Sequence, residues 1–87
     1  MSIYISTLSE LRVTLAEYKQ KNIDLDTLIA AVWQASSEVV LIEEKELRLF
    51  LQKSEAELDS LKFTVDDNLL FSETLKVVER MEARLPD

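Results

Sequence analysis

The chain has no glycine, and its one proline, Pro86, lies close to the end of its 87 residues. Tight β-hairpin turns require residues that adopt positive φ, and glycine is the residue that does so without steric cost. An all-β fold is therefore a poor match, and helices joined by short turns remain. A chain of this length has room for one domain with one core. The sequence predicts a single all-α domain over residues 1–87.

The first predicted helix runs from about Thr7 to Lys21. Thr7 and Glu10 have the spacing of a capping box, in which each side chain binds a backbone N–H at the start of the helix. Apolar residues recur at the spacing of one helix face. They are Leu8, Leu11, Leu15 and Tyr18. We expect Tyr4 and Tyr18 to be core residues rather than binding anchors, with hydroxyls that reach solvent at a helix edge.

A second helix is predicted after a turn at residues 22–24, with Asp24 or Asp26 as its N-cap. It should reach Ser36 or beyond. Its apolar stripe is formed by Leu25, Leu28, Ile29, Val32 and Trp33. A lone Trp at this spacing is more often a core residue than an exposed anchor for a partner, so we expect Trp33 to be buried.

Residues 39–42 are continuously apolar, and we expect a bend near residues 41–43. The third helix should end between Ser54 and Lys62, followed by an extended segment at residues 63–65. Its apolar side consists of Leu47, Phe50, Leu51, Leu58 and Leu61, with Ser54 as a polar interruption. Residues 66–68, Asp-Asp-Asn, supply N-cap candidates for a fourth helix. Its apolar residues are Leu70, Phe71, Leu75, Val78, Met81 and Leu85.

Four amphipathic segments with short connections predict an antiparallel four-helix bundle. The longest uninterrupted apolar run, Leu28 to Trp33, is far shorter than a membrane-spanning helix. The N-terminus has no basic segment followed by an apolar one, as an export signal would have. We therefore expect a cytoplasmic protein, with which the absence of cysteine is compatible.

The composition removes the commonest catalytic designs. Without histidine or cysteine, the chain cannot form a His-activated nucleophile or a thiolate metal site. A carboxylate pair with arginines in a pocket remains the one enzyme hypothesis, although Arg12, Arg48, Arg80 and Arg84 show no clustering beyond the last two. Residues 66–68 lack the alternating acids, central glycine and distal glutamate of a calcium loop. We expect no enzyme activity, cofactor or metal.

Acidic residues dominate the charge, with 17 carboxylates against 10 lysines and arginines and a net charge of -7. Nucleic-acid binding normally rests on clusters of Lys and Arg, so nucleic acid is a poor partner and a basic protein is a better one. The stretch from Glu38 to Asp67 holds nine acids and four bases. Most of the excess negative charge therefore falls on the third helix and the turn after it.

On a continuous third helix, the acids would lie on two flanks of the apolar side. One flank would hold Glu44, Glu55 and Asp59, and the other Glu46 and Glu57. Glu55 and Asp59 form a like-charged pair one turn apart, which Lys62 relieves only in part. The charges alone leave two interpretations open, an ordinary solvated helix face and a binding surface.

The segment from Leu58 to Asn68, with its continuation to Met81, resembles the C-terminal half of the colicin D immunity protein family. The similar features are an acid-rich stretch at residues 54–59, an aromatic-x-aliphatic-Asp-Asp-Asn run at residues 63–68, and an amphipathic closing helix. The likeness covers about half of the chain, and the total length is also similar. The family fold is a four-helix bundle, which agrees with the helical periodicity.

This resemblance implies an inhibitor of a tRNA-cleaving bacterial toxin, such as the C-terminal domain of a colicin or of a contact-dependent growth inhibition effector. Immunity proteins of this type plug a basic nuclease cleft. By position, the residues that look like the family's toxin-contacting acids are Glu55, Glu57 and Asp59, with Asp66 and Asp67 flanking them.

Two hypotheses from different classes follow. The leading one is an immunity protein that binds a basic nuclease toxin domain one to one, through the third helix and the following turn, without nucleic acid, membrane or catalysis. The competing one is a structural or regulatory bundle that self-associates through apolar surface around Val39–Ile42 or Trp33, with its acidity serving solubility.

Overall fold

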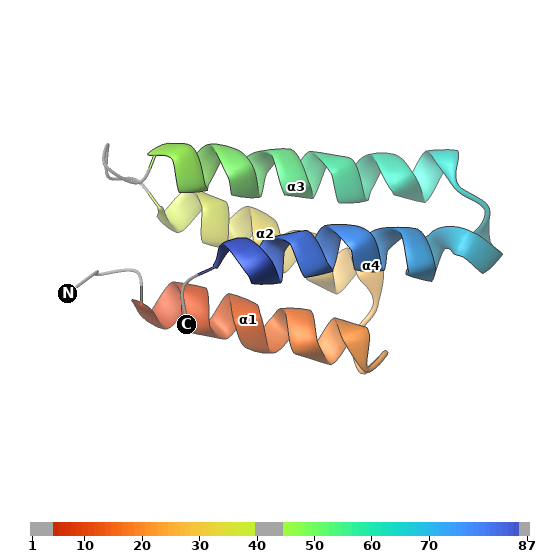
Figure 1. The fold of residues 1–87 in the computed structure, drawn as a ribbon, viewed down its shortest axis with the longest axis horizontal. Coiled ribbons are helices and arrows are strands. Elements are labelled where there is room, and N and C mark those ends of the chain that lie inside the picture. The colour runs from red at the N-terminus through yellow and green to blue at the C-terminus, as the bar shows by residue number, and fades with distance from the viewer. Residues whose placement is uncertain (1–4, 40–44, 86–87) are drawn as a thin grey trace.

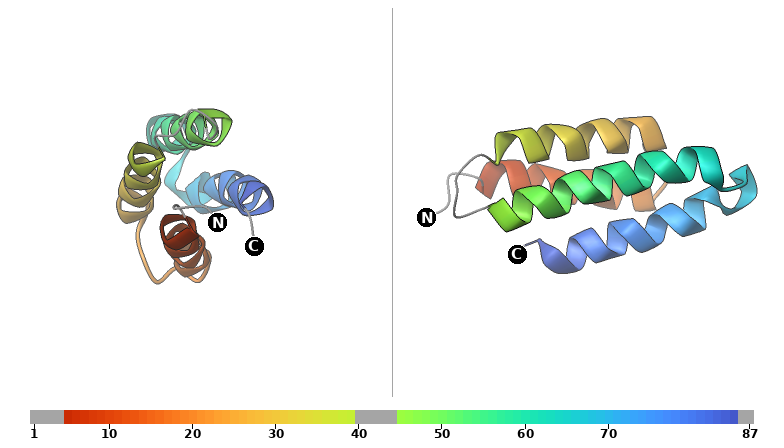
Figure 2. Two further views of the ribbon diagram at one scale, coloured as in Figure 1. Left: turned by 90° about the vertical axis from the view of Figure 1, so that its left-hand side faces the viewer. Right: turned by 90° about the horizontal axis from the view of Figure 1, so that it is seen from above.

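The computed structural model describes residues 5–39 and 45–85, which form four α-helices. These are α1 (Ile5–Lys19), α2 (Leu25–Glu38), α3 (Lys45–Thr64) and α4 (Asp67–Arg84). They pack as an antiparallel bundle about 41 Å long, in which successive helices run in opposite directions (Figure 1). Seen end-on, they form a ring in which α4 returns to α1 (Figure 2). The predicted all-α four-helix bundle is confirmed.

One apolar cluster lies along the bundle axis and draws on all four helices. Its buried members are Leu8, Leu11, Leu15, Tyr18, Leu28, Val32, Ala35, Val39, Leu51, Leu58, Val77, Val78, Met81 and Leu85. Burying a Leu or Val side chain contributes roughly 1.5–3 kcal/mol each. The packing of α2 on α3 is the most extensive, and that of α1 on α4 the least. Within residues 5–39 and 45–85, no helix combines the length and hydropathy needed to cross a bilayer.

Of the N-caps predicted for the first two helices, the one for α1 is wrong and the one for α2 is confirmed. Because α1 begins at Ile5, the predicted capping box at Thr7 is wrong, and the Thr7 hydroxyl instead donates to Glu38 Oε2 at 2.8 Å. Asp24 is the N-cap of α2, and its Oδ1 accepts a hydrogen bond from the Thr27 backbone N–H at 2.8 Å. Hydrogen bonds from the side chain and backbone of Thr27 hold the pKa of Asp24 below its ordinary value. As predicted, α2 extends past Ser36.

The end of α1 forms a Schellman motif without glycine. The Lys21 N–H donates to Tyr18 O and the Asn22 N–H to Glu17 O, both at 2.9 Å, which is the hydrogen-bond pattern of that motif. The motif places Lys21 at φ 63°, in the left-handed region where glycine is usual. A lysine therefore bears a steric cost that a glycine at this position would avoid.

The third helix is longer than the sequence predicts. It continues to Thr64, so the predicted end by Lys62 and the extended segment at residues 63–65 are wrong. The Val65 N–H still donates to Leu61 O at 3.1 Å, which continues the helical hydrogen bonding. Ser54 does not break the helix, because its small side chain is buried on the core side.

The turn into α4 places Asp66 at the N-cap, as predicted, but through its backbone. Its C=O accepts the Leu69 N–H at 2.9 Å, and its carboxylate makes no capping hydrogen bond. Thr74 and Val77 are buried on α4 although the predicted stripe omits them. The bend predicted near residues 41–43 lies outside the described residues.

Trp33 is 60% exposed, so its predicted place in the core is wrong. The buried stripe of α2 passes through Val32 and Ala35, and Ser36 is buried beside it. The small side chains at 35 and 36 occupy the core side that an indole would otherwise take. Trp33 therefore lies at the edge of the helix face.

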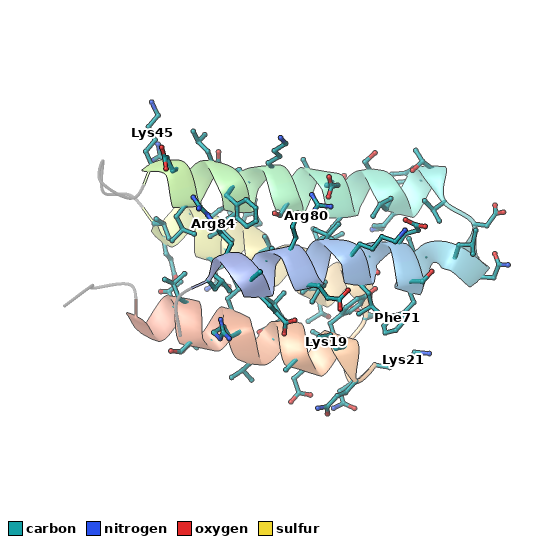
Figure 3. The ribbon with its side chains drawn as sticks, viewed as in Figure 1. Lys19, Lys21, Lys45, Phe71, Arg80 and Arg84 are labelled. Atoms are coloured by element: carbon teal, nitrogen blue, oxygen red, sulfur yellow. The ribbon has the colours of Figure 1, made fainter. Side chains whose placement is uncertain are left out.

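Tyr18 is buried, so its predicted place in the core is confirmed, but the predicted solvent contact of its hydroxyl is wrong. Tyr4 lies outside the described residues. The Tyr18 Oη lies 2.6 Å from Thr74 Oγ1, which is within hydrogen-bond distance of the carbonyls of Leu70 (2.9 Å) and Phe71 (3.0 Å). The Thr74 hydroxyl has one proton, which it donates to these backbone carbonyls. Its oxygen therefore accepts the hydrogen bond with Tyr18, and Tyr18 is the donor. The rings of Tyr18 and Phe71 are 5.4 Å apart, and Lys21 Nζ lies 4.7 Å from the Phe71 centroid at the same end of the bundle (Figure 3).

This donor order predicts unequal costs for removing the two hydroxyls. Tyr18→Phe should lower the free energy of unfolding by about 1 kcal/mol, because Thr74 keeps its backbone acceptors. Thr74→Val should cost about 1–3 kcal/mol, because the buried Tyr18 hydroxyl loses its acceptor. In urea denaturation, the double variant should be less destabilised than the sum of the two. Additive costs would contradict the pairing.

The left-handed backbone at Lys21 should carry a cost in stability that substitution can measure. The Lys21→Gly variant should have a free energy of unfolding about 1 kcal/mol higher than that of the Lys21→Ala variant, because only glycine adopts positive φ without a Cβ clash. Both variants lose the Lys21 ammonium beside Phe71, so their difference isolates the backbone effect. Thermal and urea unfolding of the pair measure it, and equal stability would show that the left-handed conformation carries no cost.

Candidate functional site

The five predicted carboxylates run along the second half of α3 and into the start of α4. Glu55, Glu57 and Asp59 belong to α3, Asp66 lies in the turn, and Asp67 is the first residue of α4. An α-helix rotates by about 100° per residue, which places Glu57 about 200° from Glu55. The structure therefore puts Glu57 on the opposite flank of α3 from Glu55, and the two flanks face different helices.

Arg80 of α4 neutralises Glu57. Arg80 Nη2 lies 3.0 Å from Glu57 Oε2, and Arg80 Nη1 donates a hydrogen bond to Glu57 Oε1 at 3.4 Å. Oε2 is buried and accepts no well-aligned hydrogen bond, so the attraction at that oxygen is Coulombic. Nearer the start of α3, Arg84 Nη2 lies 4.0 Å from Glu46 Oε2, and Arg84 Cζ lies 5.7 Å from the centroid of the Phe50 ring. Figure 3 shows both arginines on the side of α4 that faces α3, so this flank is charge-compensated within the chain.

The other flank of α3 faces α2, where Lys62 pairs with Asp26. The hydrogen bond to Asp26 raises the pKa of Lys62, and the charges of Asp26, Asp59 and Asp24 add to the effect. Asp59 lies three residues before Lys62 on the same side of the helix. Because the Lys62 ammonium is bound to Asp26, it attracts Asp59 only through its charge at longer range.

The pair of Lys62 and Asp26 also shows which residues of the two antiparallel helices lie opposite each other. Seven residues make nearly two turns, so a step of seven returns to the same helix face. Seven residues before Lys62 is Glu55, and seven after Asp26 is Trp33. Glu55 and Trp33 therefore border the same α2–α3 seam, about 10 Å along the helices from the ion pair.

Four of the five predicted carboxylates have no cation partner within 4.0 Å in the part of the chain that the structure describes. They are Glu55, Asp59, Asp66 and Asp67, which we call the acidic end. Three are exposed, Glu55 is partly buried, and the Asp66 carboxylate makes no capping bond. The acidic end therefore carries four negative charges that its own helices leave without an ion pair.

Phe63 lies within the acidic end, and the sequence did not mark it as a functional residue. It is 79% exposed, more than any other large apolar side chain in residues 7–39 and 45–85. Asp59 precedes it by one helical turn, and Asp66 and Asp67 follow it directly after the helix ends. Helical periodicity was the available signal, because a residue five positions after the buried Leu58 falls on the outward face.

A groove of about 140 Å³ lies between α1 and α2. It is lined by Thr7, Glu10, Leu11, Thr14, Ala31, Gln34, Ala35 and Glu38. The lining includes carboxylates, hydroxyls and an amide but no Lys or Arg, so it does not supply the converging arginines that the enzyme hypothesis requires. Within the described ranges, no three carboxylates gather as metal ligands would.

Comparison of the chain with protein-family models, with curated proteins and with solved structures found no match. The resemblance to the colicin D immunity protein family therefore stays a prediction from the sequence. The candidate site is defined by geometry and charge: the acidic end, the exposed Phe63 within it, and Trp33 across the α2–α3 seam.

Proposed function

We propose that the chain is an immunity protein that binds and neutralises a basic, tRNA-cleaving ribonuclease toxin in the cytoplasm, one to one and without catalysis. The observation that carries the proposal is the acidic end, whose four carboxylates have no cation partner among the described residues. The choice of a tRNA-cleaving toxin rests on the resemblance of residues 58–81 to the colicin D immunity protein family.

The chemistry of such a toxin matches this surface. A nuclease that binds tRNA needs a groove lined with Lys and Arg to hold phosphates, and carboxylates at comparable spacing can occupy the same groove. The net charge of -7 also favours rapid encounter with a basic domain, since complementary fields raise association rates. Ion pairs that lose water in the complex then slow its dissociation. Occupying the groove is sufficient to exclude tRNA.

Among the five predicted acids, Glu57 differs from the others in having a cation partner among the residues that the structure describes. Its pairing with Arg80 means that a toxin would have to displace an internal cation to use it. Glu55 and Asp59 face away from that pair and need no such exchange. The toxin-binding role is therefore assigned to Glu55, Asp59, Asp66 and Asp67, and a structural role to Glu57.

Charge reversal tests this assignment. Glu55→Lys combined with Asp59→Lys should weaken binding to the nuclease domain encoded beside the gene by at least about 30-fold, because unpaired charges then remain in the interface. Calorimetry and tRNA-cleavage inhibition at two salt concentrations measure the loss. The matched control, Glu10→Lys with Glu79→Lys, makes the same change in net charge at exposed sites on α1 and α4. Equal losses for the two pairs would refute the acidic end as the binding surface.

One observation favours the competing hypothesis of self-association, namely the 60% exposure of Trp33. The other surface named for it contributes less, because Val39 is fully buried and residues 40–42 lie outside the described part of the chain. A buried indole is a common anchor in stable interfaces, and a self-associating bundle would use Trp33 in this way.

Sedimentation equilibrium separates the two hypotheses. As an immunity protein, the chain should sediment as a monomer at micromolar concentration, and Trp33→Ala should leave its mass unchanged. A self-associating bundle would instead give a dimer that persists in high salt and dissociates on Trp33→Ala. Val13→Ala, at a site of similar exposure on α1, serves as the control.

A further inference from the structure

Phe63 is unusual because its ring lies on the outward face of a helix whose other large side chains are mostly packed. The described residues include five exposed large apolar side chains, and Phe63 at 79% exceeds Val13 at 61% and Trp33 at 60%. Single exposed apolar residues are common on protein surfaces and need no explanation. Phe63 differs in its surroundings, because three exposed carboxylates lie within four residues of it in the chain.

The ring has one cation near it, and that cation is already engaged. Lys62 Nζ lies 5.9 Å from the ring centroid, at the outer limit of about 6 Å for a cation–π contact. The same nitrogen is bound to Asp26 on α2. The ammonium is therefore drawn toward α2, and the ring is left available to a second cation. Asp59, Asp66 and Asp67, which surround the ring in sequence, have no ion-pair partner in the described ranges.

We propose that Phe63 is a stacking platform for an arginine of the partner, whose guanidinium lies flat on the ring and pairs with a neighbouring carboxylate of the acidic end. This inference rests on the proposed function and specifies the chemistry of the same surface. Arginine fits better than lysine because its planar guanidinium stacks on aromatic rings and binds carboxylates through two parallel hydrogen bonds. Lysine offers a compact charge that does neither.

The arrangement extends the imitation of RNA from its phosphates to its bases. In single-stranded RNA, a protein's arginine stacks on a base and pairs with a phosphate nearby. At the acidic end, Phe63 supplies the flat π-surface and Asp59 an adjacent anion one helical turn away. A nuclease groove that binds a base and a phosphate would therefore meet an aromatic surface and an anion on one short segment of this chain.

A double-mutant cycle with the nuclease domain encoded beside the gene tests the stack. Phe63→Leu keeps most of the apolar area but removes the π-face, and should weaken binding between about 2-fold and 30-fold. Phe63→Ala should weaken it at least as much, and Val13→Ala should leave it unchanged. Changing the groove arginines of the nuclease to lysine, one at a time, should identify one whose loss is not additive with Phe63→Leu. Because Phe63 is exposed, unfolding transitions of the variants should match that of the unsubstituted chain.

The possible failures are distinguishable. If Phe63→Leu binds as tightly as the unsubstituted chain while Glu55→Lys with Asp59→Lys does not, the arginine stack is refuted and the proposed function stands. Additivity with every groove arginine refutes the stack in the same way. If the unsubstituted chain neither binds nor inhibits the nuclease, the proposed function fails and takes this inference with it. A dimer that Phe63→Ala dissociates would show that a second copy of the chain covers the ring, and would also overturn the inference.

Discussion

The burial of Leu51 and Leu58 sets the rotation of α3, and that rotation decides the environment of every charged side chain on it. Both leucines are fully buried against the other helices, and each contributes roughly 1.5–3 kcal/mol to folding. Turning α3 enough to exchange its two acidic flanks would expose both. No exposed ion pair on this helix offers a comparable free energy, since such pairs contribute about 0–1 kcal/mol. The core therefore assigns Glu57 to the α4 side and Glu55 to the α2 side, and the ion pairs follow.

Much of the fold follows from local sequence, because the signals that specify it are local. The absence of glycine, the N-cap at Asp24 and the leucine spacing on α1 each act within a few residues, and the structure bears out the helices they predict. The errors fall where tertiary contacts decide. Phe63, Thr64 and Val65 have strand propensity, yet the first two are helical, because side-chain propensity is weak beside the packing of a 20-residue helix.

The candidate site was predictable in its position along the chain but not in its composition. The density of acids between residues 54 and 67 is visible in the sequence. Nothing local indicates that Arg80, 23 residues after Glu57, pairs with it, because that contact depends on the rotation of α4 about its own core residues. The exposure of Trp33 was not predicted, for a related reason. Helical periodicity gives the spacing of the apolar residues, but it does not show how wide the buried face of a helix is. The buried face of α2 includes Ala35 and Ser36, which leaves Trp33 at its edge.

The four carboxylates of the acidic end fall into two pairs, and only one pair is placed where its charge stabilises the fold. Asp66 and Asp67 sit at the N-terminus of α4, where the helix dipole favours negative charge, so their presence has a structural reason apart from any partner. Glu55 and Asp59 lie in the C-terminal half of α3, away from any helix N-terminus that would favour their charge, and they repel each other across one turn. Lys62, whose charge attracts Asp59, is bound to Asp26 instead. Since local stability explains the first pair and opposes the second, the case for a basic partner depends most on Glu55 and Asp59.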